Sequence, residues 1–496
     1  MPRKPRLLPS DTSTASQRVA AGQNFQPGAH QTTAALREFP CGQCLPGCEA
    51  EESMADVRRL LTTDLTYSGF LDGLAARRLV ATMLKTYKAA QTSPRWTQDP
   101  YLNKLGTGGE RFSKVLSAIF DFSTNVEYCS ARQRRVTDSK WIYCNAAQDG
   151  AAGTAPGTCA RVFYSFLKQC PSCCLNVGLE ARIEGAQHKP PSHHIGEITG
   201  SLMGMLLVPV LLSHTPALHY GMVTKQSHSV DAVAFNRDLA VLMEIKASPL
   251  VTLPIASDLT DPMTTDTDDG TREYDRHKLV DFIHRSAPLY FFVPHRNQRI
   301  PLGTPTTQSW PYDPVTAYME SVNAFLDYVS AWAELFDAFC VPKTERTGRV
   351  ERVAYLTNGW GDEIDSNKTK PGLGRTDDLK KGTYQLLKYG AYYKDICKRR
   401  TLYSALLANL DPVNLWTEYL ERLLDVRWTK EAHLTEVNNL YQVSRDRMYH
   451  LYEAIVAFNR PVLNEPRLRT IFDFDRAHTA LVSGTLDTPL LEPWLA

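Results

Sequence analysis

The fold-deciding stretch runs Ser229-Val-Asp-Ala-Val-Ala-Phe235, then Asn236-Arg-Asp238, then Leu239-Ala-Val-Leu-Met-Glu-Ile-Lys-Ala247. Apolar and β-branched residues dominate both flanks, and the polar triplet separates them, so the pattern predicts two antiparallel strands joined by a tight turn. Alternation with a period of two divides the second strand into two faces. One face carries Leu239, Val241, Met243 and Ile245, and the other carries Ala240, Leu242, Glu244 and Lys246.

This hairpin brings three charged side chains together. If residues 236–239 form the loop, Phe235 pairs with Ala240, and Asp231 then lies directly across the ladder from Glu244. Two carboxylates at that distance repel each other, and a half-buried Lys246 needs a partner. A hard divalent cation resolves both problems. The stretch therefore predicts a Mg²⁺ site with Asp231 and Glu244 as ligands, and with Lys246 beside the attacking water.

The pattern Asp-x12-Glu-x-Lys on adjacent strands resembles the core of the PD-(D/E)XK nuclease superfamily. Val230 stands where these nucleases often carry the proline. The resemblance implies an α/β (α+β) fold with a restriction-endonuclease-like core, in which helices flank a mixed central sheet and large helical additions surround it. It also implies Mg²⁺-dependent hydrolysis of DNA that leaves 5′-phosphate and 3′-hydroxyl ends.

Upstream of the hairpin, residues 193–204 are expected to form a helix that carries Glu197 near its start. In the resembled family, a Glu on this helix often joins the metal site, so Glu197 is a candidate third Mg²⁺ ligand. The alternative is a charge that complements the helix dipole, and the sequence leaves both open. Gly196, Gly200 and Gly204 form a stripe that predicts close approach of the helix to a strand.

Downstream, Gln385 and Tyr389 are spaced to share one face of a helix, with Lys380, Lys381 and Lys388 nearby. The Gln-x-x-x-Tyr motif is similar to one in RecB-type and phage-exonuclease-type nucleases, where it borders the active site and contacts DNA. Gln385, Lys388 and Tyr389 are therefore candidate DNA-binding residues, and an amphipathic surface helix is the alternative. The long separation from Lys246 requires an insertion at about 256–350 within a nuclease core of residues 191–395.

Cysteines gather before this core. Residues 126–190 form a Cys-rich module in which Cys129, Cys144, Cys170 and Cys173 are spaced to bind a structural Zn²⁺; buried free thiols are the alternative. Arg132, Arg134 and Arg135 are expected to contact DNA phosphates, against the alternative of a solvated loop. Residues 1–52 have the composition of a disordered tail, and Met54 is a possible alternative start.

The rest of the chain is expected to be mainly helical. Helical spacing predicts a helical N-terminal region at 54–125, a helix at 317–340, mostly helix at 375–458 and a helical C-terminal region at 396–496. Apolar runs predict strands at 289–293 and 353–357.

Composition excludes several classes of protein. Among the 496 residues, 55 Lys and Arg balance 54 Asp and Glu, so any basic DNA-binding surface must be local. No apolar run reaches the ~20 residues of a membrane helix. The 11 cysteines without a signal peptide favour a reducing cytoplasm.

These features, taken with the resemblance, favour a bacterial type II restriction endonuclease of a restriction-modification system. Its expected partners are double-stranded DNA, a second copy in a homodimer and a cognate DNA methyltransferase. A RecB-like repair or recombination nuclease is one alternative, and a non-catalytic, zinc-stabilised DNA-binding protein is the other.

Overall fold

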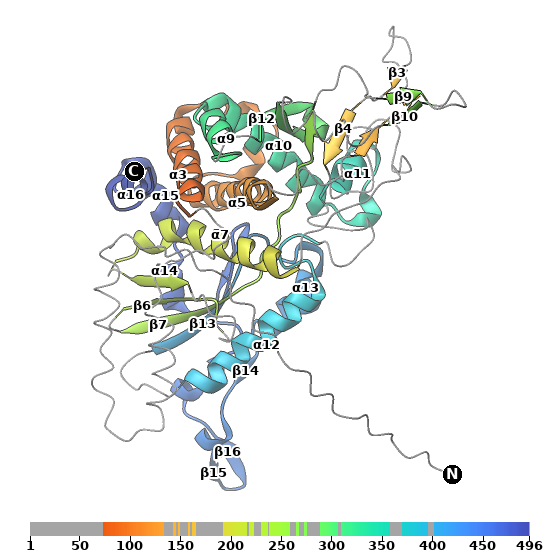
Figure 1. Cartoon of the computed structure of the whole chain (residues 1–496). Helices are drawn as coiled ribbons and strands as arrows, with labels where there is room; N and C mark the ends of the chain where they lie inside the picture. Colours follow the sequence, from red (N-terminus) through yellow and green to blue (C-terminus); the bar gives the residue numbers. More distant parts are fainter. Residues whose placement is uncertain are drawn as a thin grey trace, which may run out of the picture.

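A computed structural model provides the structure of the chain (Figure 1). It describes residues 73–132, 192–215, 218–222, 230–236, 238–257, 288–305, 309–357, 370–394 and 401–495, and the short strands at 142–144, 147–148, 157–158, 161–164, 264–266 and 272–274. The predicted tail at 1–52 and most of the Cys-rich module lie outside these residues.

A mixed six-stranded sheet forms the centre of the molecule, in the order β19-β18-β13-β7-β6-β5. Strand β13 runs parallel to both of its neighbours, β7 and β18, and the remaining pairs are antiparallel. The mixed α/β class and the flanking helices predicted from the sequence are confirmed. The strands are β5 (His219–Met222), β6 (Ala232–Phe235), β7 (Leu239–Ile245), β13 (Thr401–Ala408), β18 (Ala454–Ala457) and β19 (Arg460–Leu463).

The β6–β7 hairpin has the predicted register. Phe235 pairs with Ala240, and the ladder continues to Ala232 opposite Met243. The backbone N–H of Asp231 donates to the carbonyl of Met243 at 3.0 Å, which extends the pairing to Asp231 opposite Glu244. At the turn, the Asn236 side chain accepts hydrogen bonds from the N–H groups of Asp238 and Leu239, so its amide closes the loop.

Two helices cover the two faces of this sheet. Helix α7 (Ser192–Leu212) shares one apolar core with Ala234, Val241 and Met243. Helix α12 (Thr376–Tyr393) packs on the other face, in a second core that includes Val233 and Leu242. Strand β7 is buried along its whole length because both of its faces are covered. Figure 1 shows α7 between the sheet and the helices α3 (Gly73–Ala89), α5 (Gly108–Arg132) and α10 (Val322–Cys340).

The glycines that bring a helix close to the sheet are not those predicted. An added Cβ at Gly196 or Gly200 of α7 would meet nothing within 4 Å, so the prediction of close approach at these two positions is wrong. In α12, a Cβ at Gly382 would lie 2.8 Å from Cδ1 of Leu406 in β13. Gly382 therefore allows α12 to lie against the sheet.

A second sheet and a group of helices complete the fold. The five-stranded sheet has the order β1-β4-β8-β11-β12, so strands from the Cys-rich segment and from the predicted insertion pair within one sheet. Its strands are β1 (Ile142–Cys144), β4 (Arg161–Tyr164), β8 (Ile255–Ser257), β11 (Leu289–Val293) and β12 (Gln298–Gly303). The helices are α3 (Gly73–Ala89), α4 (Arg95–Gln98), α5 (Gly108–Arg132), α9 (Tyr312–Met319), α10 (Val322–Cys340), α11 (Gly348–Tyr355), α13 (Trp416–Tyr419), α14 (Pro466–Ile471), α15 (Phe474–Ser483) and α16 (Glu492–Leu495).

Two secondary-structure predictions are corrected. The predicted strand at 353–357 is not present. Residues 353–355 are the last of helix α11 and 356–357 follow it, because Val353 and Ala354 are the buried side of an amphipathic helix. The helical prediction for the C-terminal region fails over β13, β18 and β19. Strand β13 is buried on both faces, so its sequence lacks the alternation that distinguishes a strand from a buried helix.

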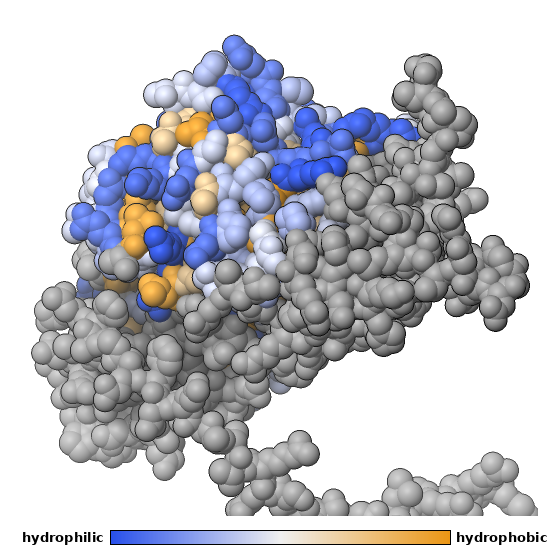
Figure 2. All heavy atoms as spheres, turned by 45° about the horizontal axis from the view of Figure 1, so that its top comes forward, coloured by the Kyte–Doolittle hydropathy of each residue, from blue (hydrophilic) through white to orange (hydrophobic). Residues whose placement is uncertain are grey.

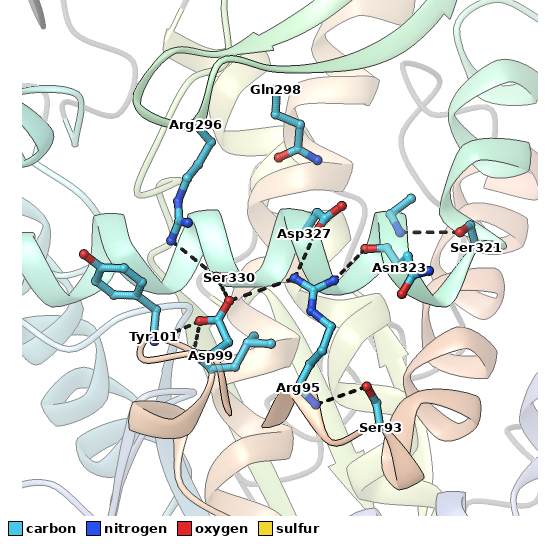
Figure 3. A network of polar contacts seen from close by, with 12 residues as sticks. Ser93, Arg95, Asp99, Tyr101, Arg296, Gln298, Ser321, Asn323, Asp327 and Ser330 are labelled. Carbon is cyan, nitrogen blue, oxygen red and sulfur yellow. Dashed lines mark hydrogen bonds and ion pairs between the residues drawn. The ribbon is translucent and has the colours of Figure 1, made fainter. Parts of the chain in front are cut away.

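A polar network holds the N-terminal helices to α10 (Figure 3). Asp99 accepts hydrogen bonds from the N–H groups of Tyr101 and Leu102 and from the Ser330 hydroxyl, the last at 2.7 Å. Arg95 forms an ion pair with Asp327 at 2.7 Å. Arg95 and Asp99 lie in and directly after α4, and Asp327 and Ser330 lie in α10. The network therefore fixes α4 against α10.

Helix α5 also holds the segment that follows β7. The buried carboxylate of Asp121 accepts hydrogen bonds from the N–H groups of Leu250 and Val251 and from the Trp332 indole. Asn125 accepts from the N–H of Leu253 at 2.7 Å. The chain is therefore fixed a few residues beyond Lys246, at the end of the strand that carries Glu244. Burial raises the pKa of Asp121 to about 8, against the lowering effect of these hydrogen bonds.

Among the residues that Figure 2 colours by hydropathy, hydrophilic ones predominate, and apolar side chains occur in small separate groups. Among the helices that the structure describes, none combines the length and the apolar character needed to cross a bilayer.

Candidate active site

Asp231 and Glu244 lie on neighbouring strands at the end of the β6–β7 hairpin. Asp231 Oδ2 accepts a hydrogen bond from the N–H of Ile245 at 2.7 Å, which fixes its carboxylate across the ladder. Burial and, after it, the charge of Glu244 raise the pKa of Asp231 to about 6, against the lowering effects of Lys246 and of the hydrogen bond from Ile245. The fold thus holds two carboxyl groups close together in a buried place, where their repulsion makes Asp231 harder to ionise.

Lys246 lies beside these acids and pairs with one of them. Its ammonium group donates to Glu244 Oε1 in a close ion pair and to the Ile245 carbonyl at 3.3 Å. Burial alone lowers the pKa of Lys246, but the charges of Glu244 and Asp231 outweigh burial and raise it. Lys246 is therefore an ammonium ion at neutral pH, so it can donate a hydrogen bond or stabilise negative charge, but it cannot accept a proton.

Helix α12 closes the site from the other side. The Tyr389 hydroxyl donates to Glu244 Oε2 at 2.5 Å, and the Tyr389 ring is buried in the core between α12 and the sheet. Gln385, one turn earlier, lines the same pocket as Glu244 and Lys246. The two residues of the Gln-x-x-x-Tyr motif, about 140 residues from Lys246 in the sequence, are thus brought to the predicted acids. The Tyr389 side chain is buried and hydrogen-bonded to Glu244, so it is not accessible for the DNA contact predicted from the sequence.

The pocket is open and has a volume of about 310 Å³. Its outer rim is basic and aromatic, because Lys380, Lys381 and Tyr384 of α12 are exposed there. Lys388, the third predicted cation of this helix, is half-buried one turn beyond Tyr384. A carboxylate-containing floor below a cationic rim is an arrangement that can hold a phosphate diester above a cation.

Two residues of this site were not singled out from the sequence. Tyr384 is 64% exposed at the rim, and the charge of Asp378 contributes to the raised pKa of Lys246. The helical period could have identified Asp378, because residues 378, 381, 385 and 389 lie on one face of a helix. Tyr384 lies four residues after Lys380 and three after Lys381, so it belongs to the neighbouring basic stripe.

The predicted third ligand is not found beside the acids. Within the described residues, no three His, Cys, Asp or Glu side chains are grouped as ligands of a metal ion. Glu197 lies on α7, which packs against the sheet face opposite the one that carries Asp231 and Glu244. Asp231 and Glu244 still fit Mg²⁺, because they supply hard oxygen donors and a cation would relieve their repulsion. Other ligands would be backbone carbonyl, water or phosphate oxygens.

The predicted zinc site and basic run fall largely outside the described part of the chain. Cys129 is buried in α5, and Cys144 ends strand β1. The side chains of Cys144, Cys170, Cys173, Arg132, Arg134 and Arg135 are outside the described residues.

Comparison of the chain with protein-family models, with curated proteins and with solved structures finds no match.

Proposed function

We propose that the chain is a Mg²⁺-dependent endonuclease that hydrolyses DNA phosphodiester bonds at a short double-stranded site, as type II restriction enzymes do. The observation that carries the proposal is the meeting of Asp231, Glu244 and Lys246 at the end of one hairpin, under a pocket with a basic rim. The restriction-endonuclease-like core, the homodimer, the partner methyltransferase and the cytoplasmic location belong to the same proposal. So does a structural Zn²⁺ in the Cys-rich segment.

In this mechanism the acids hold the cation and the basic rim holds the substrate. Asp231 and Glu244 would bind Mg²⁺, which when bound supplies positive charge at the reacting phosphate and lowers the pKa of a water molecule. Lys246 orients the attacking water and stabilises the negative charge that develops on phosphate oxygens. Water attacks phosphorus in line with the departing 3′ oxygen and gives up a proton to the surrounding solvent. The bond between phosphorus and the 3′ oxygen breaks, and that oxygen takes a proton from a solvent water, so the products are a 3′-hydroxyl and a 5′-phosphate.

Residues of α12 position the other groups. Lys380 and Lys381 neutralise backbone phosphates next to the scissile bond, because both ammonium groups line the pocket rim. Gln385 can donate a hydrogen bond to a phosphate oxygen inside the pocket. Tyr389 holds Glu244 through its hydroxyl and acts as a positioning residue.

The test is digestion of two forms of DNA. Purified full-length chain is incubated with circular plasmid and with linear phage DNA, with Mg²⁺ or with EDTA. Defined fragments from both substrates, only with Mg²⁺, are the expected result. The absence of cleavage with Mg²⁺, with Mn²⁺ and over a range of pH would contradict the proposal and favour a DNA-binding protein.

A RecB-like nuclease is the second candidate, and one observation favours it. The Gln-x-x-x-Tyr motif that is similar to the one in such nucleases lies at the pocket. The same digest separates the two candidates, because a RecB-like enzyme would degrade linear DNA from its ends and leave intact circles uncut.

Tyr389→Phe is expected to lower the cleavage rate by about 10- to 100-fold, since groups that hold a metal ligand in place have effects of this size. The variant loses only the hydroxyl that donates to Glu244, so the melting temperature should change little. The Mg²⁺ concentration for half-maximal rate should rise in parallel, which loss of packing alone would not cause. Tyr328→Phe is the matched control, because it removes a buried hydroxyl that donates to the Ala118 carbonyl and does not line the pocket. An unchanged Mg²⁺ dependence in Tyr389→Phe would contradict the positioning role.

A further inference from the structure

Exposed apolar side chains are concentrated in two segments of the chain. In the described part of the chain, ten large apolar side chains are exposed, and seven of them belong to α12 or to residues 426–448. Two are on α12, beside the candidate active site, and five are on the segment that leads to β18. The seven are Tyr384, Leu387, Val426, Val437, Leu440, Tyr441 and Met448.

The second group lies on a two-stranded ribbon, residues 426–451, which we call the arm. It closes at its base with a hydrogen bond from the N–H of Leu451 to the carbonyl of Val426, and β14 (Arg427–Trp428) pairs there with β17 (Tyr449–His450). At its tip, β15 (Thr435–Val437) pairs with β16 (Leu440–Gln442). Figure 1 shows the arm extending away from the body of the molecule beyond α12.

The base of the arm is fixed to the C-terminal end of α12. Lys394, directly after α12, forms a buried ion pair with Glu453, directly after the arm. The Lys394 ammonium lies 4.5 Å from the ring centre of Tyr449, and the rings of Tyr449 and Trp428 lie 5.1 Å apart. Gly390 of α12 has room for no side chain, since its Cβ would lie 2.6 Å from Trp428. The arm therefore has a built attachment to the helix that lines the pocket.

The tip, by contrast, contacts little of the rest of the chain. All six residues of β15 and β16 are exposed, with Leu440 at 67% and Tyr441 at 71%. Asn438 and Asn439 form the turn with positive φ angles of 53° and 59°, as a tight two-residue hairpin requires. Leaving Leu440 and Tyr441 in water has a cost without a benefit to folding, so the tip is suited to contact another molecule.

The reach of the arm matches the dimensions of a DNA duplex. The nine residues from Gln385 to Lys394 span about 13 Å of helix. The segment from Trp428 to Val437, which includes a 3₁₀ turn at Glu431–His433, adds at most about 30 Å even at the ~3.3 Å per residue of an extended chain. The tip can thus lie up to about 40 Å from the pocket, which is close to one turn of B-DNA, ~34 Å.

The chemistry of the tip fits a groove of DNA better than a second copy of the chain. A two-stranded ribbon fits the major groove, where Asn and Gln amides pair with adenine edges and apolar side chains contact thymine methyl groups. The tip offers Asn438, Asn439 and Gln442, with Arg445 and Arg447 farther back for phosphates. Leu440 shares one face of the ribbon with Val437, and the carboxylate of Glu436 shares the other face with Tyr441, so the face of Leu440 is the one suited to DNA. The three apolar side chains at the tip would bury roughly 400 Å², about half of what each partner contributes to a standard protein interface.

We propose that the arm enters a groove of the DNA held at the pocket, about one helical turn from the scissile phosphate, and contacts base edges there. This inference rests on the proposed function, because it takes the pocket as the place where DNA is cut. It assigns to the arm a role in choosing the DNA sequence next to the cleavage site.

Photo-crosslinking tests the contact directly. The photoreactive residue p-benzoylphenylalanine is incorporated in place of Leu440, Lys381 or Leu74 in separate full-length chains that carry Asp231→Asn to keep DNA intact. Each chain is irradiated with a labelled duplex of about 40 base pairs, nearly four turns. We expect covalent DNA adducts from position 440 and from position 381, and none from position 74, an exposed leucine of α3.

The other outcomes separate the two proposals. An adduct from position 381 without one from position 440 overturns the role of the arm and leaves the nuclease proposal standing. A protein–protein adduct from position 440 without a DNA adduct overturns the role of the arm and makes it a contact between copies. The absence of DNA adducts from both positions overturns both proposals.

Affinity provides the second measurement. In the Asp231→Asn background, L440S/Y441S should raise the Kd for a duplex of about 40 base pairs at least about tenfold. The reason is that the loss of one base contact changes the Kd by about this factor. The Kd for a duplex of about 8 base pairs, which spans roughly 27 Å and is too short to reach from the pocket to the tip, should change less than about twofold. L74S is the matched control and should change neither value. Equal losses on both duplexes, or none on the long one, would overturn the inference.

Discussion

Asp231→Ala and Lys246→Ala will each lower the rate of DNA cleavage by at least about 10²- to 10⁴-fold, the range found when a group acting on the reacting atoms is removed. The structure gives a separate reason for each. Asp231→Ala removes one of the two carboxylates that face each other across β6 and β7. Lys246→Ala removes the ammonium group that pairs with Glu244 and is also stabilised by the charge of Asp231. The two carboxylates then face each other without a compensating positive charge.

The fold should survive both changes, because the cores on the two faces of the sheet do not depend on these side chains. Asp231→Asn is the matched variant, since its amide oxygen can still accept the hydrogen bond from Ile245 while the charge is gone. It should be as inactive as Asp231→Ala. Lys85→Ala, an exposed lysine of α3, should cleave at the normal rate. Circular dichroism and melting curves establish folding, and the initial rate of plasmid cleavage establishes activity. Normal cleavage by either Asp231 variant or by Lys246→Ala would mean that this site is not catalytic.

The hairpin at the centre of the site could be predicted from the sequence because it is local. The period of two fixed which side chains share a face, and Asn236 supplied the turn, so the pairing of Phe235 with Ala240 followed from a loop of four residues. The position of Gln385 and Tyr389 beside Glu244 depended on a resemblance, because no local pattern tells which helix will pack on which sheet face.

Long-range pairing could not be predicted in the same way. Strand β13 lies next to β7 although about 160 residues separate Leu239 from its partner Thr401. Nothing within an eight-residue apolar segment specifies a parallel neighbour so far away, and burial of both faces removed the alternation that identifies a strand. The arm escaped prediction for the opposite reason, because its short exposed strands are bounded by turns and have no apolar face directed at a core.

For Glu197, the helix was predicted correctly from the sequence, but the structure does not support the predicted role of Glu197 as a metal ligand. The helix over residues 193–204 is present within α7, but α7 covers the sheet face opposite the one with the acids. Sequence periodicity places a helix without saying which face of a sheet it will cover, and that choice decides whether Glu197 can reach the metal.

Lys394→Met will destabilise the fold by about 3–5 kcal/mol, the usual cost of removing one partner of a buried ion pair. The side chains of Lys394 and Glu453 are each only 5% exposed, so water cannot replace the lost ammonium. Glu453 also accepts hydrogen bonds from the N–H and the hydroxyl of Ser404 in β13, so the pair links the end of α12, the arm and the central sheet. Urea unfolding at neutral pH measures the loss. Lys104→Met, which breaks an exposed ion pair with Asp337, is the control and should cost less than about 1 kcal/mol.

The pH dependence of this loss identifies its cause. Burial already raises the pKa of Glu453, and Lys394 opposes that effect. Without Lys394 the folded-state pKa of Glu453 should rise further above its unfolded value. An acid of this kind favours the folded state below its unfolded pKa and loses that contribution as the pH rises through its folded pKa. The deficit of Lys394→Met should therefore be smaller at pH 5 than at pH 8. K394M/E453Q, which keeps an acceptor for Ser404 and removes the uncompensated charge, should recover most of the stability at pH 8. A deficit that is independent of pH and persists in the double variant would instead assign the loss to the contacts of Lys394 with Tyr449 and Trp428.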